Sequence, residues 1–182
     1  MTEISPTGRS NPRLRQTAGD MVRSLALVLG VVAVILIVTL RPQPDAVKVI
    51  DYQPELAVAR AQAGYPVLAP VGLDADWRAT SVRWQPTTGS TPDKAWHLGF
   101  VTPDDAYAQL GQSSTTNVNY LPEQTDRGQP MGRVSVGGFD WQQYTSKAGQ
   151  RSLVRVDRGV TIVVTGTADW AALELFATSL RS

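Results

Sequence analysis

The sequence predicts an α+β fold in which one twisted antiparallel sheet carries helices packed on one face, with a single transmembrane helix before this domain. Three observations carry the prediction. Residues 21–40 are almost continuously apolar, short strand-like runs follow one another at hairpin spacing in the last third, and the chain ends on an amphipathic helix pattern. Strands joined by tight turns pair antiparallel, and an amphipathic helix buries its apolar side against such a sheet.

The membrane-spanning helix is predicted from residues 21–40, which read MVRSLALVLGVVAVILIVTL. A bilayer core about 30 Å thick needs roughly 20 helical residues, each rising about 1.5 Å. The run Leu25–Val38 contains only apolar residues and one glycine. Arg23 lies at one edge of the segment, where its side chain can reach the headgroups, and Arg41 closes the other edge. The lipid bilayer is therefore the first predicted partner.

The flanking charges predict the direction of this segment. Four arginines lie before or at its start and only Arg41 follows closely, so the positive-inside rule leaves the N-terminus in the cytoplasm. We predict a disordered cytoplasmic tail over residues 1–20, a linker over residues 41–46 and an extracytoplasmic domain over residues 47–182. A cleaved signal peptide is the alternative, but Thr39–Pro42 offers no small-x-small cleavage pattern.

The first half of the domain is predicted to be a helix between short strands. Proline at the first helical position and Gly64 after the last one predict a helix over Pro54–Ala63. Runs rich in aromatic and β-branched residues predict strands before and after it. These strands cover Val47–Tyr52, Trp77–Gln85 and Ala95–Thr102, with an irregular segment at Tyr65–Pro70 and a polar loop at Pro86–Lys94.

Two structures are compatible with Asp104–Gln112. Thr102 and Pro103 suit the start of a helix, and they equally suit a type I turn with proline at its second position. The turn lets Tyr107–Ser113 return as a hairpin partner. We favour this hairpin because the segment is short and ends in glycine and serines. A short helix over Asn117–Gln124 is predicted next.

The last third of the chain predicts four strands and a closing helix. Glycine-containing turns separate the strands, and alternating branched residues indicate a sheet buried mainly on one face. Thr167 is predicted to cap a helix over Ala168–Leu180, whose apolar face includes Trp170. The four strands cover Arg133–Val136, Phe139–Thr145, Ser152–Val156 and Val160–Thr165.

Several of these segments resemble a known family. The residues that carry the resemblance are Ala63–Pro70 (AGYPVLAP), Trp77–Ser81 (WRATS), Trp96–Pro103 (WHLGFVTP), Gly138–Trp141 (GFDW) and Thr165–Ala168 (TGTA). Together they resemble an actinobacterial, membrane-anchored family catalogued as domain of unknown function family 4245, whose members typically have one N-terminal transmembrane segment. The strand pattern is also similar to Mog1/PsbP-like domains, which is a fold-level analogy. The resemblance implies no catalytic or ligand residues.

No arrangement of catalytic side chains is apparent in the sequence. The chain has no cysteine, which excludes disulfides, thiol catalysis and zinc–thiolate sites. His97 is the only histidine and lies within a predicted strand. Gly132–Gly137 approaches a Gly-x-Ser-x-Gly motif around Ser135, but its first glycine stands one position too early. A hydrolase would need His97 beside Ser135 or another hydroxyl.

Two carboxylate pairs, Asp104 with Asp105 and Asp74 with Asp76, are interpreted as turn residues. Paired carboxylates bind calcium in some loops. These pairs lie beside turn or strand-start signals, where the short side chain of aspartate is favoured for local hydrogen bonds. The sequence contains no calcium loop and no phosphate-binding glycine loop of known spacing. We therefore predict no metal ligands, no cofactor and no catalytic residues.

Tryptophan is the unusual feature of the domain. Trp77 and Trp84 stand seven apart in one predicted strand, so strand alternation places them on opposite faces, where at least one can meet a ligand. Trp96 and Trp170 are expected to fill the core of a domain that has no disulfides. The five tryptophans are Trp77, Trp84, Trp96, Trp141 and Trp170. Because tryptophan is enriched at binding hot spots, a tryptophan-lined surface is the alternative to a purely structural role.

These observations predict a non-enzymatic extracytoplasmic domain tethered to the cell membrane. The chain has a net charge of +1 over 182 residues, without the basic stripe that nucleic-acid binding requires, so no nucleic acid is expected as a partner. The leading hypothesis is an accessory or protein-interaction module of the cell envelope with an envelope protein as partner. The alternative is a binding module for a small envelope ligand, such as a glycan or lipid fragment, in a pocket lined by Trp77 or Trp84.

Overall fold

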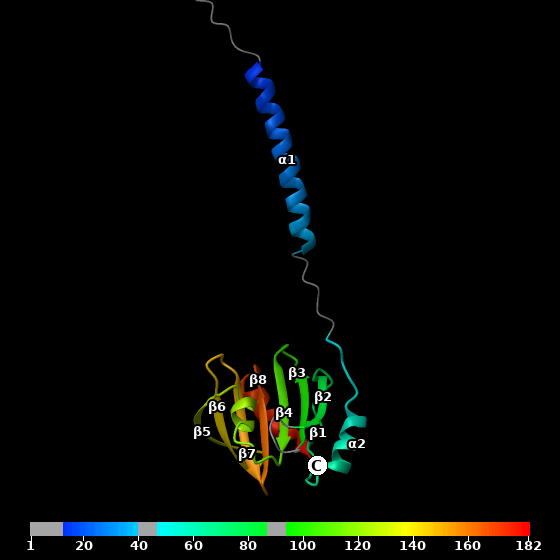
Figure 1. The fold of residues 1–182 in the computed structure, drawn as a ribbon, viewed down its shortest axis with the longest axis vertical. Coiled ribbons are helices and arrows are strands. Elements are labelled where there is room, and N and C mark those ends of the chain that lie inside the picture. The colour runs from blue at the N-terminus through cyan, green and yellow to red at the C-terminus, as the bar shows by residue number, and fades with distance from the viewer. Residues whose placement is uncertain (1–12, 40–46, 87–93) are drawn as a thin grey trace, which may run out of the picture. The chain divides into compact units, whose positions relative to one another are not determined.

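The structure is a computed structural model that describes residues 13–39, 47–86 and 94–182 (Figure 1). The chain consists of two compact units, residues 1–46 and residues 47–182. The predicted linker lies outside the described residues, as do the first twelve residues of the predicted tail and most of the predicted polar loop after Pro86.

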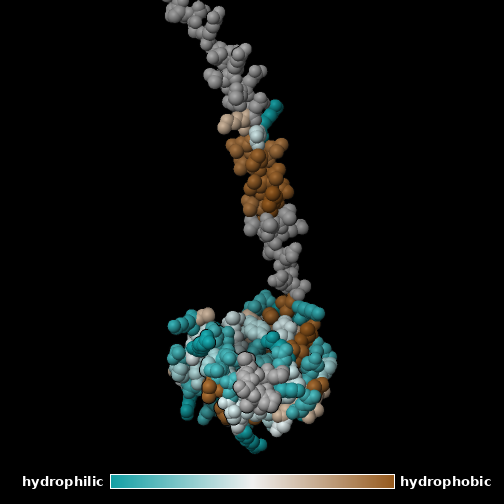
Figure 2. Space-filling model, viewed as in Figure 1, coloured by the Kyte–Doolittle hydropathy of each residue, from teal (hydrophilic) through white to brown (hydrophobic). Residues whose placement is uncertain are grey.

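The described part of the first unit is one helix, α1 (Arg13–Thr39), which begins inside the tail predicted to be disordered up to residue 20. The predicted transmembrane segment falls on α1, and the described side chains of residues 21–36 are exposed and mainly apolar (Figure 2). Within the described ranges, no helix combines the length and the apolar character that crossing a membrane requires.

The second unit is built on a seven-stranded sheet in which every pair of neighbouring strands is antiparallel. The strand order is β2-β3-β4-β8-β7-β6-β5. The strands are β2 (Arg78–Pro86), β3 (Lys94–Val101), β4 (Tyr107–Ser113), β5 (Gln129–Val136), β6 (Phe139–Thr145), β7 (Arg151–Asp157) and β8 (Val160–Gly166). The predicted antiparallel α+β architecture is confirmed. Within Asp104–Gln112, the residues from Tyr107 onward belong to β4, the second arm of a hairpin with β3, as favoured from the sequence.

One face of this sheet carries the hydrophobic core. A row of buried side chains crosses the centre of the sheet, because Leu98 lies opposite Leu110, Leu110 opposite Val164 and Val164 opposite Leu153. We call this side of the sheet the apolar face. Alternation along each strand places the next residue on the other side.

The opposite side carries mainly polar residues. One row on this side consists of Gln109, Thr165, Ser152 and Tyr144, each opposite the next on neighbouring strands. We call this side the polar face. The central strands place Val163 there as well, fully buried, so this face also needs cover.

Helices cover both faces, which corrects the prediction that all helices pack on one face. The helices α2 (Gln53–Gln62) and α4 (Trp170–Ser179) bury Leu56, Leu173 and Phe176 in the core of the apolar face. The third helix, α3 (Tyr120–Gln124), packs on the polar face. A Cβ atom at Gly111, which lies opposite Val163, would stand 2.7 Å from Oε1 of Gln124 and 3.4 Å from the hydroxyl of Tyr120.

Two predicted elements differ in detail. Val47–Tyr52 forms no strand, although the N–H of Ile50 donates to the carbonyl of Ala79 at 2.9 Å. Helix α4 is capped by Asp169, whose Oδ1 accepts from the N–H of Ala172 at 2.8 Å. The hydroxyl of the predicted cap, Thr167, instead accepts from the N–H of Tyr107 at 2.9 Å, at the start of β4.

A second, two-stranded sheet joins β1 (Ala69–Pro70) to β9 (Leu180–Arg181) at the C-terminus. The predicted helix before it is confirmed as α2, and Gly64 ends it with a φ of 68°, a conformation that favours glycine. The segment predicted to be irregular thus supplies one short strand, which lies beside the end of α4.

Candidate functional site

His97 belongs to a hydrogen-bonded chain on the polar face. Nδ1 of His97 lies 3.3 Å from Nε2 of Gln109, and Oε1 of Gln109 accepts from the hydroxyl of Tyr107 at 2.9 Å. The amide donates, so Nδ1 is the acceptor and the imidazole proton is on Nε2. Burial, with a smaller contribution from the cation of Arg83, lowers the pKa of His97 to about 4. The imidazole is therefore neutral at pH 7, and its Nδ1 atom is occupied by the hydrogen bond from Gln109.

The structure separates His97 from Ser135. His97 lies on β3 and Ser135 on β5, with four strands between them in the sheet order. Five strand spacings of about 4.8 Å place them roughly 24 Å apart across the sheet. The nearest hydroxyls in the described network, those of Tyr107 and Ser81, are linked to the imidazole only through Gln109. The pairing that a hydrolase would need is not assembled.

Both aspartate pairs lie at turns. The carbonyl of Asp74 accepts from the N–H of Trp77 at 3.0 Å, and Asp105 donates its N–H to the carbonyl of Thr102 at 3.0 Å. Asp105 also forms an exposed ion pair with Arg78. Among the described residues, no group of three or more histidine, cysteine, aspartate or glutamate side chains could hold a metal ion.

The prediction that Trp77 and Trp84 point to opposite faces is wrong. The ladder between β2 and β3 has a register shift between Ala79 and Ser81, which adds one residue and reverses the alternation. Both tryptophans therefore lie on the apolar face. Trp77 is buried and stacks on Phe176, with ring centroids 5.6 Å apart.

The tryptophans fill different roles. Trp96 and Trp141 are buried in the core, while Trp170 and Trp84 are partly buried at its edge. The indole N–H of Trp84 donates to Oε1 of Gln62 on α2 at 2.9 Å. The ring of Trp84 is therefore tied to α2, whereas Trp77 lines a cavity.

That cavity is an apolar groove of about 360 Å³ beside the start of the domain. Trp77 and Phe100 belong to its lining, and two of the exposed large hydrophobic residues of the domain, Val49 and Val71, lie in or beside its walls. The space-filling view shows brown surface gathered where the chain enters the domain (Figure 2). The apolar groove is lined by Val49, Ile50, Tyr52, Pro70, Gly72, Leu73, Asp74, Ala75, Trp77, Ala79 and Phe100.

The walls of the apolar groove are held by the main chain. The N–H of Val71 donates to the carbonyl of Ser179 at 2.9 Å, and the N–H of Trp77 closes the turn at Asp74. On the opposite wall, Ile50 is bonded to Ala79, and the ring of Tyr52 packs edge-on against Phe100 at 5.9 Å. A groove with anchored walls is largely formed before a partner arrives, which lowers the entropy cost of binding.

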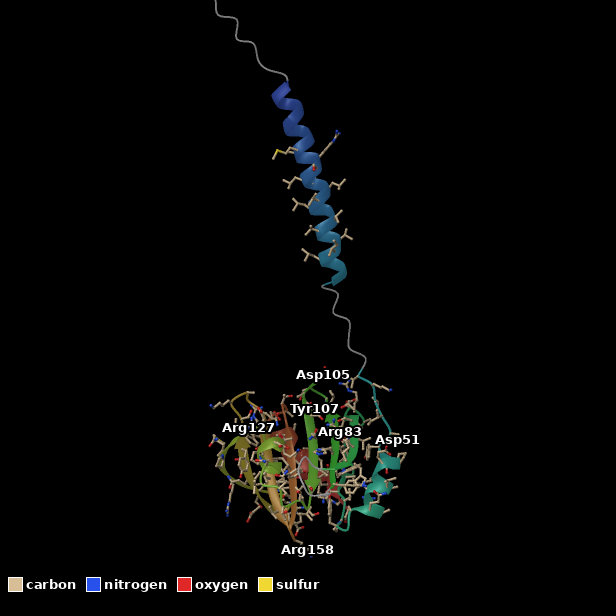
Figure 3. The ribbon with its side chains drawn as sticks, in the orientation of Figure 1. Asp51, Arg83, Asp105, Tyr107, Arg127 and Arg158 are labelled. Atoms are coloured by element: carbon tan, nitrogen blue, oxygen red, sulfur yellow. The ribbon has the colours of Figure 1, made fainter. Side chains whose placement is uncertain are left out.

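Exposed acidic residues lie on the two wall segments of the apolar groove, and one of them, Asp74, lines it. The two wall segments, residues 47–52 and 70–77, carry three exposed aspartates against one lysine. These residues are Asp51, Asp74, Asp76 and Lys48, of which Asp51 is labelled in Figure 3. The rim formed by these two segments therefore carries a net negative charge.

A second cavity, of about 230 Å³, lies on the apolar face at the opposite end of the sheet. The labelled Arg158 at the turn between β7 and β8 marks this end, and Asp105 marks the other (Figure 3). The guanidinium of Arg155 lines the cavity, 3.9 Å from the ring centroid of Phe139 and 5.2 Å from that of Trp141. We call this the Arg155 cavity.

The comparisons with known proteins place the chain in a family. A family model described as protein of unknown function (DUF4245) matches residues 13–180. The chain belongs to this family. The predicted family resemblance is thus confirmed, and the match spans α1 as well as the domain of this DUF4245 protein.

Beyond the family, no curated protein matches the chain in sequence. Among solved structures, one titled "Crystal structure of MucB in complex with MucA(peri)" matches at 16% identity with a TM-score of 0.38. The match covers 64% of the DUF4245 chain and 36% of the MucB chain, so the DUF4245 chain spans about a third of that chain's length.

Sequence reasoning missed both cavities. Arg155 lies in a strand of alternating residues, and the sequence around it does not predict that its guanidinium packs against two aromatic rings. Val49 was assigned to a strand, although its exposed side chain lines the apolar groove. One signal was available for Arg155, because alternation from Leu153 places it on the apolar face.

Proposed function

We propose that this DUF4245 protein is a non-enzymatic, membrane-tethered module whose extracytoplasmic domain binds a second protein of the cell envelope through the apolar groove. The observation that carries the proposal is the combination of an anchored groove, lined by Trp77 and Phe100, with one exposed valine in its lining and another beside it. Val49 is 60% exposed and Val71 is 63% exposed. Apolar side chains beside an aromatic floor are the usual composition of a protein-binding hot spot.

The charges around the apolar groove identify the chemistry of the partner. An apolar floor favours two or three aliphatic or aromatic side chains, and the acidic rim favours lysine or arginine next to them. The occupant we propose is therefore an apolar segment of a partner protein with basic flanking residues. The rim charges are exposed, so they contribute mainly to the association rate and to selectivity.

The membrane tether supports the same role. Apolar side chains are exposed along α1 from Met21 to Leu36, and the sequence continues apolar to residue 40. We expect the full chain to remain in the membrane fraction after alkaline extraction, and a variant with Leu29→Arg and Val32→Arg to be released, because a charge in the bilayer core costs about 3 kcal/mol. Release of the unchanged chain would contradict the tether.

The docking proposal is tested by placing a photo-crosslinking amino acid at Val71 in the full chain, expressed in its native membrane. Val156 is the matched control, since it is 67% exposed and lies away from the apolar groove. We expect a crosslinked protein at position 71 and not at position 156, with the crosslinked peptide mapping to an apolar segment that has basic flanks. Equal products at both positions, or crosslinks to a second copy of this chain, would refute the proposal.

The acidic rim offers a second readout. Replacing Asp74 and Asp76 with lysine reverses the rim charge without touching the aromatic floor. We expect this variant to crosslink more slowly from position 71, and the difference to shrink at high salt because exposed charges are screened. An unchanged crosslinking rate after this charge reversal would show that the partner of the apolar groove is not the proposed segment with basic flanks.

A further inference from the structure

Arg155 is largely buried, and one donor of its guanidinium has no hydrogen-bond partner. Its side chain is 11% exposed, and its Nε atom is buried without an acceptor. Its ionic contact within the described residues is with Asp157, at 3.6 Å between Nη1 and Oδ2, which is beyond hydrogen-bond distance. Buried N–H donors are almost always hydrogen-bonded, so the unpartnered Nε of Arg155 calls for an explanation.

The packing around Arg155 holds the charge in a defined place. The ring of Phe139 lies 3.9 Å from the guanidinium carbon and Trp141 lies 5.2 Å away. The two rings stabilise a cation by their electron-rich faces and leave its edge free, since ring carbons accept no conventional hydrogen bond. Arg155 is therefore positioned with its charge stabilised and its Nε donor unused.

The space beside Arg155 is the Arg155 cavity, of about 230 Å³. Leu68, Val160 and Ile162 supply apolar lining. Gln112 also lines it, but its amide is already committed, donating to the carbonyl of Pro66 at 2.7 Å and accepting from the N–H of Leu68 at 2.9 Å. The cavity thus combines apolar walls with a cationic group that has one unsatisfied donor.

We propose that the Arg155 cavity binds a small organic monocarboxylate, whose carboxylate pairs with the guanidinium of Arg155 and whose short apolar tail packs on Leu68, Val160 and Ile162. The planar guanidinium matches a carboxylate in a bidentate arrangement. The volume is below the 300–1,000 Å³ of sites for drug-sized ligands, so a ligand of only a few carbons fits. This site is independent of the protein-docking proposal, because the apolar groove lies at the other end of the sheet.

The local charges favour a single negative charge on the ligand. Arg155, Asp157 and Arg158 line the cavity, which leaves one net positive charge. Tyr65 also lines it, but burial raises its pKa to about 12, so it remains a neutral donor to the carbonyl of Gln112 at 3.1 Å. Asp157 is half exposed and acts as a weak internal competitor that an incoming carboxylate displaces.

The test is a calorimetric titration of hexanoate into the full chain in lipid nanodiscs, with empty nanodiscs titrated as the blank. We expect saturable binding at one site. Arg155→Gln is expected to weaken it ten- to hundred-fold, the effect of losing hydrogen bonds to a charged group. Arg155→Lys, which keeps the charge but loses the fork, should weaken it by a smaller factor. Asp157→Asn should tighten it several-fold, because the competitor is removed.

Controls separate a real site from loss of structure. Arg133→Gln removes an arginine that lines neither cavity and should leave the affinity unchanged. Near-ultraviolet circular dichroism reports whether Arg155→Gln keeps the native packing, and the Asp157→Asn gain needs no such check because a misfolded protein gains no affinity. Crosslinking from Val71 should be the same in all these variants, so a failure of one proposal is distinguishable from a failure of the other.

Three results would overturn the proposal. Equal binding of 1-hexanol would show that the carboxylate is not recognised. Inorganic phosphate binding as tightly as hexanoate would show a general anion site without the apolar component. Affinity that Arg155→Gln and Asp157→Asn both leave unchanged would show that hexanoate binds elsewhere.

Discussion

The two faces of the sheet are stabilised by different forces. On the apolar face, the rings of Trp77, Phe100 and Phe176 pack within 5.4–6.4 Å of one another. On the polar face, Ser152 and Thr165 are buried and their hydroxyls lie 2.7 Å apart. The apolar face depends on shape and volume, whereas the polar face depends on each buried group keeping its partner. The same sheet should therefore respond to cavity-forming changes on one side and to protonation or lost hydrogen bonds on the other.

The largest effect is expected from Phe176→Ala on the apolar face. Phe176 is fully buried between Trp77 and Phe100, so its removal leaves a cavity and should cost about 3–5 kcal/mol of unfolding free energy. Leu175→Ala is the matched control on the same helix, since Leu175 is 52% exposed and should cost less than about 1 kcal/mol. Urea unfolding followed by tryptophan fluorescence measures both. Similar losses in the two variants would show that α4 does not stabilise the fold through its buried side.

Acidification should act through the polar face. The folded pKa of His97 is about 4 and the model-peptide value is 6.5, so the unfolded chain binds a proton that the folded chain excludes between these pH values. The contribution of His97 to the free energy of unfolding is fully present above pH 6.5. It is lost as the pH falls toward 4, which lowers the free energy of unfolding by about 2–3 kcal/mol.

The variant His97→Gln isolates this contribution. Glutamine cannot be protonated, so the difference in unfolding free energy between the two proteins should change across pH 6.5–4 and be constant above it. Urea unfolding at several pH values measures the difference. Parallel pH profiles for the two proteins would mean that the imidazole is accessible to protonation in the folded state.

The smallest effect is expected from Ser152→Ala on the polar face. Thr165 keeps two other partners, the amide of Gln150 at 2.8 Å and the carbonyl of Arg151 at 3.2 Å. The loss should therefore be about 1 kcal/mol, the usual net contribution of one hydrogen bond. Thr165→Val removes all three contacts and should cost about 2–3 kcal/mol, since Ser152 and Gln150 lose a buried partner. Equal costs in thermal unfolding would indicate that the hydroxyls do not act as a network.

Several features of the fold could be predicted because they are coded locally. The hairpins from β5 to β8 follow from glycine turns between alternating residues, and α2 follows from a proline start and Gly64 at its end. Pro122 is tolerated within α3 because it lies in the first turn, where a helical N–H has no partner to lose. The candidate sites were not predicted, since both cavities join segments that are distant in the chain.

The sequence by itself determined the element types, the antiparallel class and the family, because hydrogen-bond periodicity, turn residues and capping act within a few residues of each other. Tertiary structure alone decided which face each element covers. One register shift between Ala79 and Ser81 places Trp77 and Trp84 on the same side of the sheet. On the polar face, Val163 is buried and α3 covers that face. Only packing between the neighbouring strands β6 and β7 placed Arg155 against Phe139, where its Nε atom is buried without a hydrogen-bond partner.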